Sequence, residues 1–324
     1  MNNITVAICV YNGAKYIEET LDCIIRQTFQ KFDLLIVNDC STDNTEGLII
    51  KFFEKYPRQY KLVSFNLNRG IAFGRKYILE NVPSKYLIFV DADDKAYPEL
   101  IEKLHYKIES DNSLMAVGCY LEYIDDKGFK LDGGLFIGEK TKEGFYKKAK
   151  KNKLLFMPIT TIIHRETALL AGGIRIDGYF EGQPRYQDLC EDLDLWTRMS
   201  DYYVDGKAII VIPEVLCQYR KIDQSVSTNK IGMIIKIKYV KSNLLKRRSG
   251  QPEETFVEYF NSITPRQMKI IKREARSAVL LREGFFALKK WQIFTAIRSI
   301  IYSIWFNPKY IMQKINNNIV RNKK

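Results

Sequence analysis

Short apolar runs alternate with helically spaced apolar residues over the first hundred positions of the chain. Runs rich in β-branched residues predict strands at 4–10, 34–37, 60–65 and 86–90. Apolar residues at helical spacing predict intervening helices at 17–25, 48–53 and 71–79. This alternation is typical of a parallel sheet covered by helices, with functional sites at the carboxyl ends of its strands.

The pattern changes after Pro98. Two apolar stretches, 114–124 and 129–137, flank Asp125-Asp126-Lys127-Gly128, a sequence that predicts a hairpin turn. We therefore expect an antiparallel or mixed extension of the sheet. Its further elements are a lysine-rich helix or loop at 140–153, strands at 157–164 and 204–211, and a helix at 191–199.

Helical spacing dominates from about residue 231 onward. Within 291–306 the apolar residues fall on one face and the polar residues largely on the other, which predicts an amphipathic helix. Its apolar face could pack on the rest of the chain, on a second subunit in a homo-oligomer, or on a membrane. The sequence leaves these three environments open.

The positive charge of the chain is concentrated in its last third. The net charge is +13, and residues 230–324 contain 21 Lys and Arg against 5 Asp and Glu. Residues 1–229 contain 30 against 33. A basic segment attached to a near-neutral body favours an anionic partner, either lipid head groups or nucleic acid. A solvated basic helical face is the alternative.

Cysteine spacing and hydropathy indicate the cellular compartment of the protein. The six cysteines have neither CxxC spacing nor histidine partners, which argues against a zinc site or a disulfide scaffold and favours reduced thiols. No apolar stretch reaches the roughly 20 residues needed to span a bilayer, and the N-terminus lacks signal-peptide features. We therefore expect a cytoplasmic globular enzyme.

Three carboxylates follow the apolar run that ends at Val90. Asp91, Asp93 and Asp94 lie within four residues, and in a partly desolvated crevice they stay ionised only if a cation neutralises them. Oxygen ligands without nearby His or Cys suit Mg²⁺ or Mn²⁺, whose remaining positions are usually filled by substrate phosphates and water. The alternative is an acidic turn that caps the helix beginning near Pro98.

Five segments stand in a characteristic order: 6–13, 36–43, 68–75, 89–94 and 191–196. They contain Tyr11-Asn12, Asn38-Asp39, Asn68-Arg69-Gly70, Asp91-Ala92-Asp93 and Glu191-Asp192. In this order they resemble the motifs of family 2 glycosyltransferases, an inverting group with the GT-A fold. The resemblance implies an α/β fold in which a Rossmann-like GT-A domain with a mixed central sheet precedes a mainly helical C-terminal region.

The resemblance also implies a domain division. Residues 1–229 would form the catalytic domain, with a nucleotide-sugar-binding half at 1–98 and an acceptor-binding half at 99–229. Residues 230–324 would form a basic helical region that serves membrane association or oligomerisation.

The resemblance places the metal and the nucleotide at strand ends. It implies that Asp93 binds the Mn²⁺ or Mg²⁺ and that Asp91 lies closer to the ribose, while Asp94 helps indirectly or only caps the next helix. Asp39 is expected to accept the imide hydrogen of uracil, and Tyr11 to pack beside the base. A UDP-sugar donor is therefore expected.

Further residues resemble family positions around the phosphates and the acceptor. Asn68 and Arg75 are expected near the nucleotide and its phosphates, where a guanidinium offers charge-assisted hydrogen bonds. Asp192 is the candidate base, kept ionised by its place in the first turn of a helix; Glu191 beside it is expected to contact substrate, and both could instead merely cap the helix. Arg220 is expected to approach the pyrophosphate, or to be a surface arginine.

The chain departs from the family pattern at three places. Asn38 stands where the first of two aspartates is common, Lys76 stands where Asn often follows the Arg, and the proline common before Tyr11-Asn12 is missing. None of these removes the candidate base or metal ligand.

Together these features predict a metal-dependent inverting glycosyltransferase. It would transfer a sugar from a UDP-sugar to a glycan or lipid-linked acceptor in bacterial-type cell-surface polysaccharide synthesis, at the inner face of the membrane, where the basic C-terminal region meets anionic lipid. The alternatives are a nucleotidyltransferase acting on a sugar phosphate and a nonenzymatic basic module that binds nucleic acid. The motif set argues against nucleic acid as a partner.

Overall fold

The computed structural model describes residues 2–222, 228–289, 291–308 and 312. The chain divides into two compact units, one of Met1–Ser225 with Val240–Glu253 and one of Val226–Tyr239 with Glu254–Lys324. Helix α8 (Lys230–Arg248) contributes residues to both units. The predicted domain boundary between residues 229 and 230 stays a prediction, and the compact units divide the chain at different positions.

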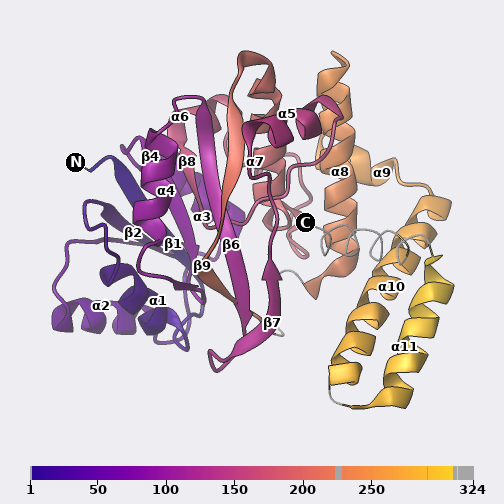
Figure 1. Cartoon of the computed structure of the whole chain (residues 1–324), viewed down its shortest axis with the longest axis horizontal. Coiled ribbons are helices and arrows are strands. Elements are labelled where there is room, and N and C mark those ends of the chain that lie inside the picture. Colours follow the sequence, from indigo (N-terminus) through magenta and orange to yellow (C-terminus); the bar gives the residue numbers. More distant parts are fainter. Residues whose placement is uncertain (1, 223–227, 290, 309–311, 313–324) are drawn as a thin grey trace. The chain divides into compact units, whose positions relative to one another are not determined.

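The first unit is built on one mixed sheet of nine strands (Figure 1). The strands are β1 (Ile4–Val10), β2 (Asp33–Asn38), β3 (Lys61–Ser64), β4 (Tyr86–Asp91), β5 (Lys95–Ala96), β6 (Leu114–Ile124), β7 (Lys130–Leu135), β8 (Thr161–His164) and β9 (Ala208–Arg220). Their order is β3-β2-β1-β4-β8-β6-β9-β5, with β7 paired to β6. Strands β1 to β4 are parallel, and β8 runs antiparallel to both of its neighbours. The predicted mixed sheet is confirmed.

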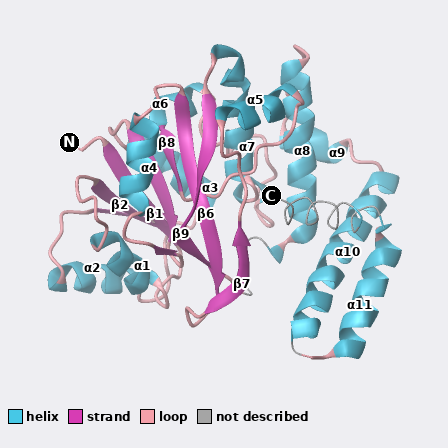
Figure 2. Cartoon of the chain, in the orientation of Figure 1, coloured by secondary structure: helices cyan, strands magenta, loops and turns pink. Residues whose placement is uncertain are grey.

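Helices flank this sheet (Figure 2). They are α1 (Ile17–Ile25), α2 (Thr45–Lys55), α3 (Ile71–Asn81), α4 (Leu100–Glu109), α5 (Lys142–Lys150), α6 (Arg165–Leu170) and α7 (Glu191–Met199), with short 3-10 helices at Tyr186–Asp188 and Ser200–Asp205. Because both faces of the central strands are covered, nearly every residue of β1 and β4 is buried. This explains why those strands read as continuous apolar runs.

The strand that ends at Arg220 differs most from its prediction. It was expected at 204–211, but the structure has β9 at Ala208–Arg220, because residues up to Asp205 form a 3-10 helix. The added length lets β9 pair with β6 as far as Arg220 and with the two-residue strand β5, which was not predicted. The turn between β4 and β5, which carries the three carboxylates, is therefore anchored at both ends.

The second unit is helical in the parts that the structure describes. It contains α9 (Phe256–Asn261), α10 (Pro265–Lys289) and α11 (Ile293–Phe306), and it includes the start of α8. Helix α11 corresponds to the amphipathic helix predicted at 291–306, and it packs beside α10 as a hairpin (Figure 1). Among the described residues, no helix has both the length and the hydropathy required to cross a bilayer.

Candidate active site

Three loops meet where the parallel strands β1, β2 and β4 end. In the sheet register Val10 lies beside Asn38, and Cys9 lies beside Asp91. The residues that follow these strands therefore lie along one edge of the sheet, as expected for a site at strand carboxyl ends.

The loops after β1 and β2 are fastened to each other. The Asn12 N–H donates to Ser41 Oγ at 2.9 Å, and Asn12 Oδ1 accepts from the Thr42 N–H at 2.8 Å. Asn12 has a φ of 51°, a left-handed conformation that Asn tolerates better than most residues. The neighbouring Tyr11 is 50% exposed, and its packing beside a base stays a prediction.

Asp39 is buried and organises the loop that leads into α3. Its carboxylate accepts from the Arg69 N–H at 2.8 Å and from the Gly70 N–H at 2.7 Å, and its backbone carbonyl accepts from Asn68 Nδ2 at 3.1 Å. The structure thus brings together Asp39 and Asn68, two of the predicted nucleotide contacts. The contact of Asp39 with uracil stays a prediction. Each carboxylate oxygen of Asp39 keeps a second lone pair that could accept the imide hydrogen.

Two residues that the sequence did not reveal, Arg185 and Asp188, hold the same loop from the other side. The Arg185 guanidinium donates to the side-chain and backbone oxygens of Asn68, and Asp188 Oδ1 accepts from the Ala72 N–H at 3.0 Å. A Cβ added to Gly70, whose φ is 90°, would lie 2.2 Å from Asp188 Oδ2. A glycine at this position signals a close approach, but it does not identify a partner more than a hundred residues away.

The structure explains why Asn rather than Asp stands at position 38. Its buried Nδ2 donates to Glu46 Oε2 at 2.7 Å, and Ser64 Oγ donates to the same oxygen at 2.6 Å. An aspartate at position 38 would place a second carboxylate against Glu46 where a donor now stands.

We expect Asn38→Asp to lower the free energy of unfolding by about 1–3 kcal/mol, because a partly buried contact between like charges replaces a hydrogen bond. Urea denaturation at pH 7 measures the loss. Asn38→Asp combined with Glu46→Gln restores a donor facing an acceptor and should recover most of it. Equal losses in the single and double variants would contradict this account.

Arg75 joins the nucleotide half to helix α7. It is only 7% exposed, its Nη2 donates to Asp91 Oδ1 at 2.6 Å, and its Nη1 donates to Glu191 Oε1. The guanidinium thus supplies a counter-charge to buried Glu191 and to partly exposed Asp91. Its place near the nucleotide phosphates stays a prediction.

One guanidinium does not neutralise all of the carboxylates around it. Burial alone would lower the pKa of Arg75, but the charges of Asp91 and Glu191 raise it above its ordinary value, so Arg75 stays cationic. Burial raises the pKa of Glu191 to about 7 and outweighs the opposing charge of Arg75. Burial also raises the pKa of Asp192, against the same guanidinium. The excess negative charge favours a proton or a further cation at this site.

Asp93 presents a carboxylate that no other side chain engages, within the part of the chain that the structure describes. Burial, followed by the charge of Asp91, raises the pKa of Asp93 to about 6. No group of three or more His, Cys, Asp or Glu among the described residues is placed to hold a metal ion. The donor set nevertheless fits Mg²⁺ or Mn²⁺, because such ions usually combine one or two carboxylates with substrate phosphates and water.

Arg220 and Asp94 hold the carboxylate turn in place. Asp94 is fully buried, and its Oδ1 accepts from the Arg220 N–H at 2.9 Å. The Arg220 guanidinium donates to the Asp93 carbonyl at 2.8 Å and to Glu19 Oε2 at 2.9 Å, and its side chain is 0% exposed. The geometry does not support the predicted approach of Arg220 to a pyrophosphate, because the longer β9 carries this side chain beneath the turn.

Helix α7 brings three carboxylates to the site in its first turn. Glu191 points inward to Arg75, and Asp194 pairs with Arg198 at 2.9 Å within the helix. Asp192 is only partly exposed; its Oδ1 accepts from the Leu193 N–H at 2.7 Å, and no cation pairs with it among the described residues. Of the three, Asp192 is thus the carboxylate left free to accept a proton from a substrate.

A mixed sheet of this topology, with an acidic turn after β4 and a mainly helical C-terminal region, has the architecture of the GT-A fold. Staphylococcus aureus TarS 1–349 in complex with UDP-GlcNAc is similar over 92% of this chain and 90% of its own, with a TM-score of 0.54 and 17% identity. The mannosyltransferase PcManGT from Pyrobaculum calidifontis, in complex with GDP-Man and Mn²⁺, is similar over 95% of this chain and 87% of its own, with a TM-score of 0.54 and 18% identity. At these identities the likeness establishes the fold alone.

The sequence itself gives the family. The family described as Glycosyl transferase family 2 matches residues 5–170, and the chain belongs to it. An uncharacterized glycosyltransferase of Rickettsia typhi is 28% identical over 253 residues, which is 76% of this chain and 73% of the relative. The putative teichuronic acid biosynthesis glycosyltransferase TuaG of Bacillus subtilis is 27% identical over 266 residues, 82% of this chain and 97% of TuaG. The predicted family, fold class and enzyme class are confirmed.

Proposed function

We propose that this glycosyltransferase moves a sugar, with inversion, from a UDP-sugar to a hydroxyl of a glycan or lipid-linked acceptor in cell-surface polysaccharide synthesis. The observation that carries the proposal is the bridge from Asp91 through Arg75 to Glu191, which joins the nucleotide half to the helix of the candidate base. The UDP-GlcNAc complex of TarS and the teichuronic acid assignment of TuaG support the donor and the pathway class.

On the donor side, Asp93 would hold a divalent ion, and Asp91 would lie toward the ribose. The ion, when bound, supplies Lewis-acid stabilisation of the departing diphosphate. The Mn²⁺ in the PcManGT complex supports a divalent metal. Tyr11 would pack beside the base, and Asp39, with Asn68, would orient the uracil.

On the acceptor side, Asp192 would take the proton of the attacking hydroxyl. The oxygen of that hydroxyl bonds to the anomeric carbon as the bond from this carbon to the UDP oxygen breaks, and the configuration inverts. Arg75 favours the ionised form of Asp192, which the base needs. Glu191, fixed by Arg75, would hold the start of α7 in position for the acceptor.

We further propose a peripheral location at the inner face of the cell membrane, where a lipid-linked acceptor is presented. Residues 230–324 contain 21 basic and 5 acidic residues, and this excess of positive charge supports an anionic membrane surface as the partner.

The test is UDP release across a panel of UDP-sugars and GDP-sugars. We expect turnover with a UDP-sugar that EDTA abolishes and that Mn²⁺ or Mg²⁺ restores. Asp93→Asn should raise the metal concentration for half-maximal rate by at least about tenfold. Asp177→Asn, which alters an exposed carboxylate outside the site, is the matched control. Activity that is indifferent to EDTA would contradict the metal assignment, and release of pyrophosphate would indicate nucleotidyl transfer instead.

A further inference from the structure

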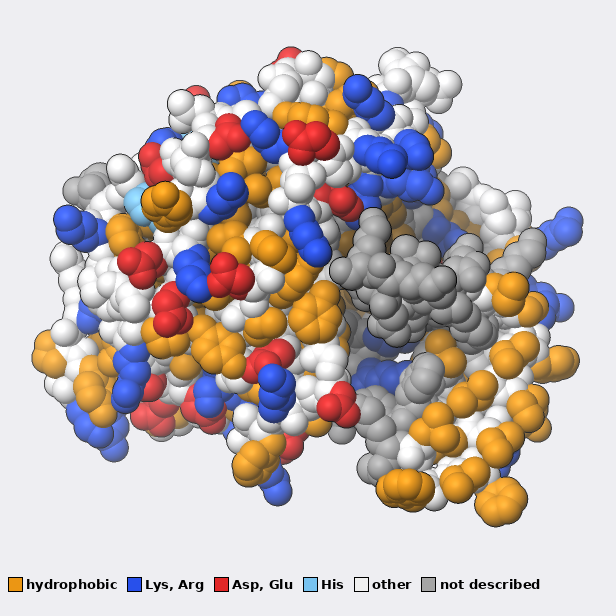
Figure 3. All heavy atoms as spheres, in the orientation of Figure 1, with side chains coloured by type: hydrophobic (Ala, Val, Ile, Leu, Met, Phe, Trp, Pro, Cys, Tyr) orange, Lys and Arg blue, Asp and Glu red, His pale blue; other side chains and the backbone are white. Residues whose placement is uncertain are grey.

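Large apolar side chains of α11 face away from the helix against which α11 packs. Phe294 is 93% exposed and Trp305 is 68% exposed, whereas Ala296, Ser299 and Ser303 are buried. Figure 3 shows hydrophobic side chains gathered on the visible face of the α10–α11 hairpin. A surface helix in water normally buries its apolar face, so α11 has the reverse arrangement.

Small and hydroxyl side chains fill the contact between α10 and α11. Ser277 Oγ donates to the Ser303 carbonyl at 2.9 Å, and Ser303 Oγ donates to the Ser277 carbonyl at 2.7 Å. Gly284 lets the helices approach, because a Cβ there would lie 2.8 Å from Ile300 Cγ1. Helices that pair within lipid pack in this way, with small residues and hydroxyl hydrogen bonds between them and large apolar side chains toward the acyl chains.

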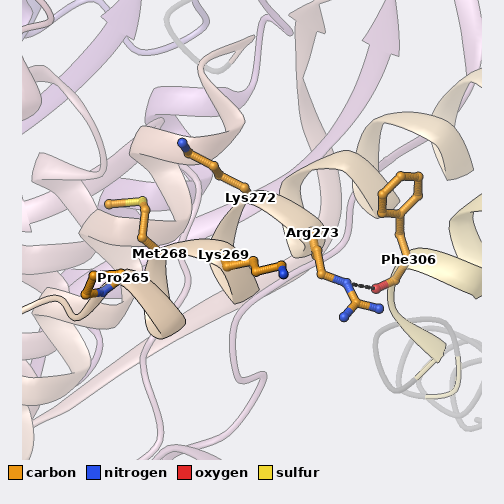
Figure 4. A pocket seen from close by; sticks show the side chains of 6 residues that line it. All are labelled: Pro265, Met268, Lys269, Lys272, Arg273 and Phe306. Carbon is orange, nitrogen blue, oxygen red and sulfur yellow. Dashed lines mark hydrogen bonds between the residues drawn. The ribbon is translucent and has the colours of Figure 1, made fainter.

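A basic hollow of about 450 Å³ lies where α10 begins and α11 ends (Figure 4). Its cations are Lys269, Lys272 and Arg273, and its other lining residues are Pro265, Met268 and Phe306. Arg273 Nε donates to the Phe306 carbonyl at 3.2 Å, which holds the guanidinium at the hollow. Among the described residues, no Asp or Glu lines the hollow, and none forms an ion pair with Lys269 or Lys272. Three cations that have no counter-charge among the described residues favour an anionic ligand.

We propose that the α10–α11 hairpin inserts into one leaflet of an anionic bilayer, with a phospholipid phosphate bound by Lys269, Lys272 and Arg273. An anionic phospholipid matches both parts of this surface, because its phosphate complements the cations and its acyl chains cover the apolar face. A second copy could cover the apolar face, but the described residues that line the hollow include no acidic residue with which a symmetric pair could neutralise these cations. The 14 residues of α11 are fewer than the roughly 20 that cross a bilayer, so the hairpin lies in the interface. The inference rests on the proposed membrane location and identifies the surface responsible.

Tryptophan fluorescence can test the insertion directly. Of the three tryptophans in the chain, Trp291 is 86% exposed and Trp305 is 68% exposed, while Trp196 is buried in the first unit. Brominated acyl chains in phosphatidylglycerol vesicles should quench the emission of the full chain, and brominated phosphatidylcholine vesicles should not. Trp291→Phe combined with Trp305→Phe should remove the quenching. Quenching that persists in this variant would overturn the proposal.

Matched charge reversals test the phosphate site. Lys269→Glu combined with Lys272→Glu should lower partition onto phosphatidylglycerol vesicles by about tenfold or more. Lys147→Glu combined with Lys150→Glu, at the same spacing on the exposed side of α5, should leave partition unchanged. Equal partition of the two double variants would overturn the lipid-phosphate site.

Two further measurements separate this inference from its rivals. Phe294→Gln combined with Trp305→Gln should abolish vesicle binding without changing UDP-sugar affinity, because neither residue belongs to the donor site. If the wild-type protein binds vesicles but transfers no sugar from any donor tested, the proposed function is refuted and the inference stands. Without lipid, sedimentation velocity should show the same oligomeric state for the wild type and for the Phe294→Gln, Trp305→Gln variant. If this variant loses a dimer that the wild type forms and still binds vesicles, the apolar face joins two copies and the inference is overturned.

Discussion

Replacement of Asp192 by Asn is expected to lower the turnover number by about 10²–10⁴-fold, the usual contribution of a positioned general base. The amide oxygen can keep the hydrogen bond from the Leu193 N–H, but it cannot accept the proton of an attacking hydroxyl. No ion pair is lost among the described residues, so the fold should be preserved. Initial rates at saturating donor measure turnover, and calorimetric titration with the UDP-sugar should show nearly unchanged affinity.

The pH profile gives this prediction a second readout. Burial raises the pKa of Asp192, so the wild-type enzyme should lose its base at a higher pH than an ordinary aspartate would allow. Turnover should therefore fall as the pH is lowered through that raised pKa, and the residual activity of Asp192→Asn should lack this acid limb. Asp177→Asn should behave as wild type. If Asp192→Asn retains wild-type turnover, the base lies elsewhere.

Replacement of Arg75 by Met should lower the free energy of unfolding by about 3–5 kcal/mol, because buried Glu191 and partly buried Asp91 lose their counter-charge. Urea denaturation measures this loss. Arg75→Met combined with Glu191→Gln should recover part of it, since only one carboxylate then lacks a partner. Arg26→Met, which breaks an exposed pair with Asp22, is the control and should cost no more than about 1 kcal/mol.

The Arg75 variant should also change the dependence of stability on pH. The pKa of Glu191 is raised to about 7 in the folded protein from its ordinary 4.5, so the folded state binds this proton more tightly than the unfolded chain does. The contribution of Glu191 to stability is therefore greatest below 4.5 and decreases as the pH rises toward 7. Without Arg75 the decrease should continue to higher pH. The deficit of Arg75→Met relative to wild type should thus be larger at pH 8 than at pH 5.5, and an equal deficit at both would contradict the assignment.

Local sequence was sufficient to predict the strand ends at the site. Residues 4–10 and 86–90 are apolar because both faces of those strands are covered, and each run stops where the site begins. The helix predicted at 191–199 coincides with α7, whose first turn carries three acidic residues. Parallel pairing of β1 with β4 then places Asp91 beside the loop of Tyr11, as the topology requires.

Contacts between distant segments could not be predicted in this way. Arg75 pairs with residues 16 and 116 positions away, and Arg220 reaches Glu19 across 201 positions. The pairing of these charged side chains depends on which distant segments the fold brings together, and that pairing leaves no periodic signal in the sequence. The packing of α11 could not be predicted either. Its sequence pattern shows that the helix has an apolar and a polar face, but not which face packs against α10.

The shared guanidinium of Arg75 also gives the two substrates a means of influencing each other's binding. On the proposed assignment, a donor that engages Asp91 alters the charge presented to Arg75, and Arg75 in turn fixes Glu191 next to the base. Donor occupancy and acceptor affinity are then coupled, and such coupling is reciprocal. The affinity of the enzyme for each substrate should therefore change by the same factor when the other substrate is bound.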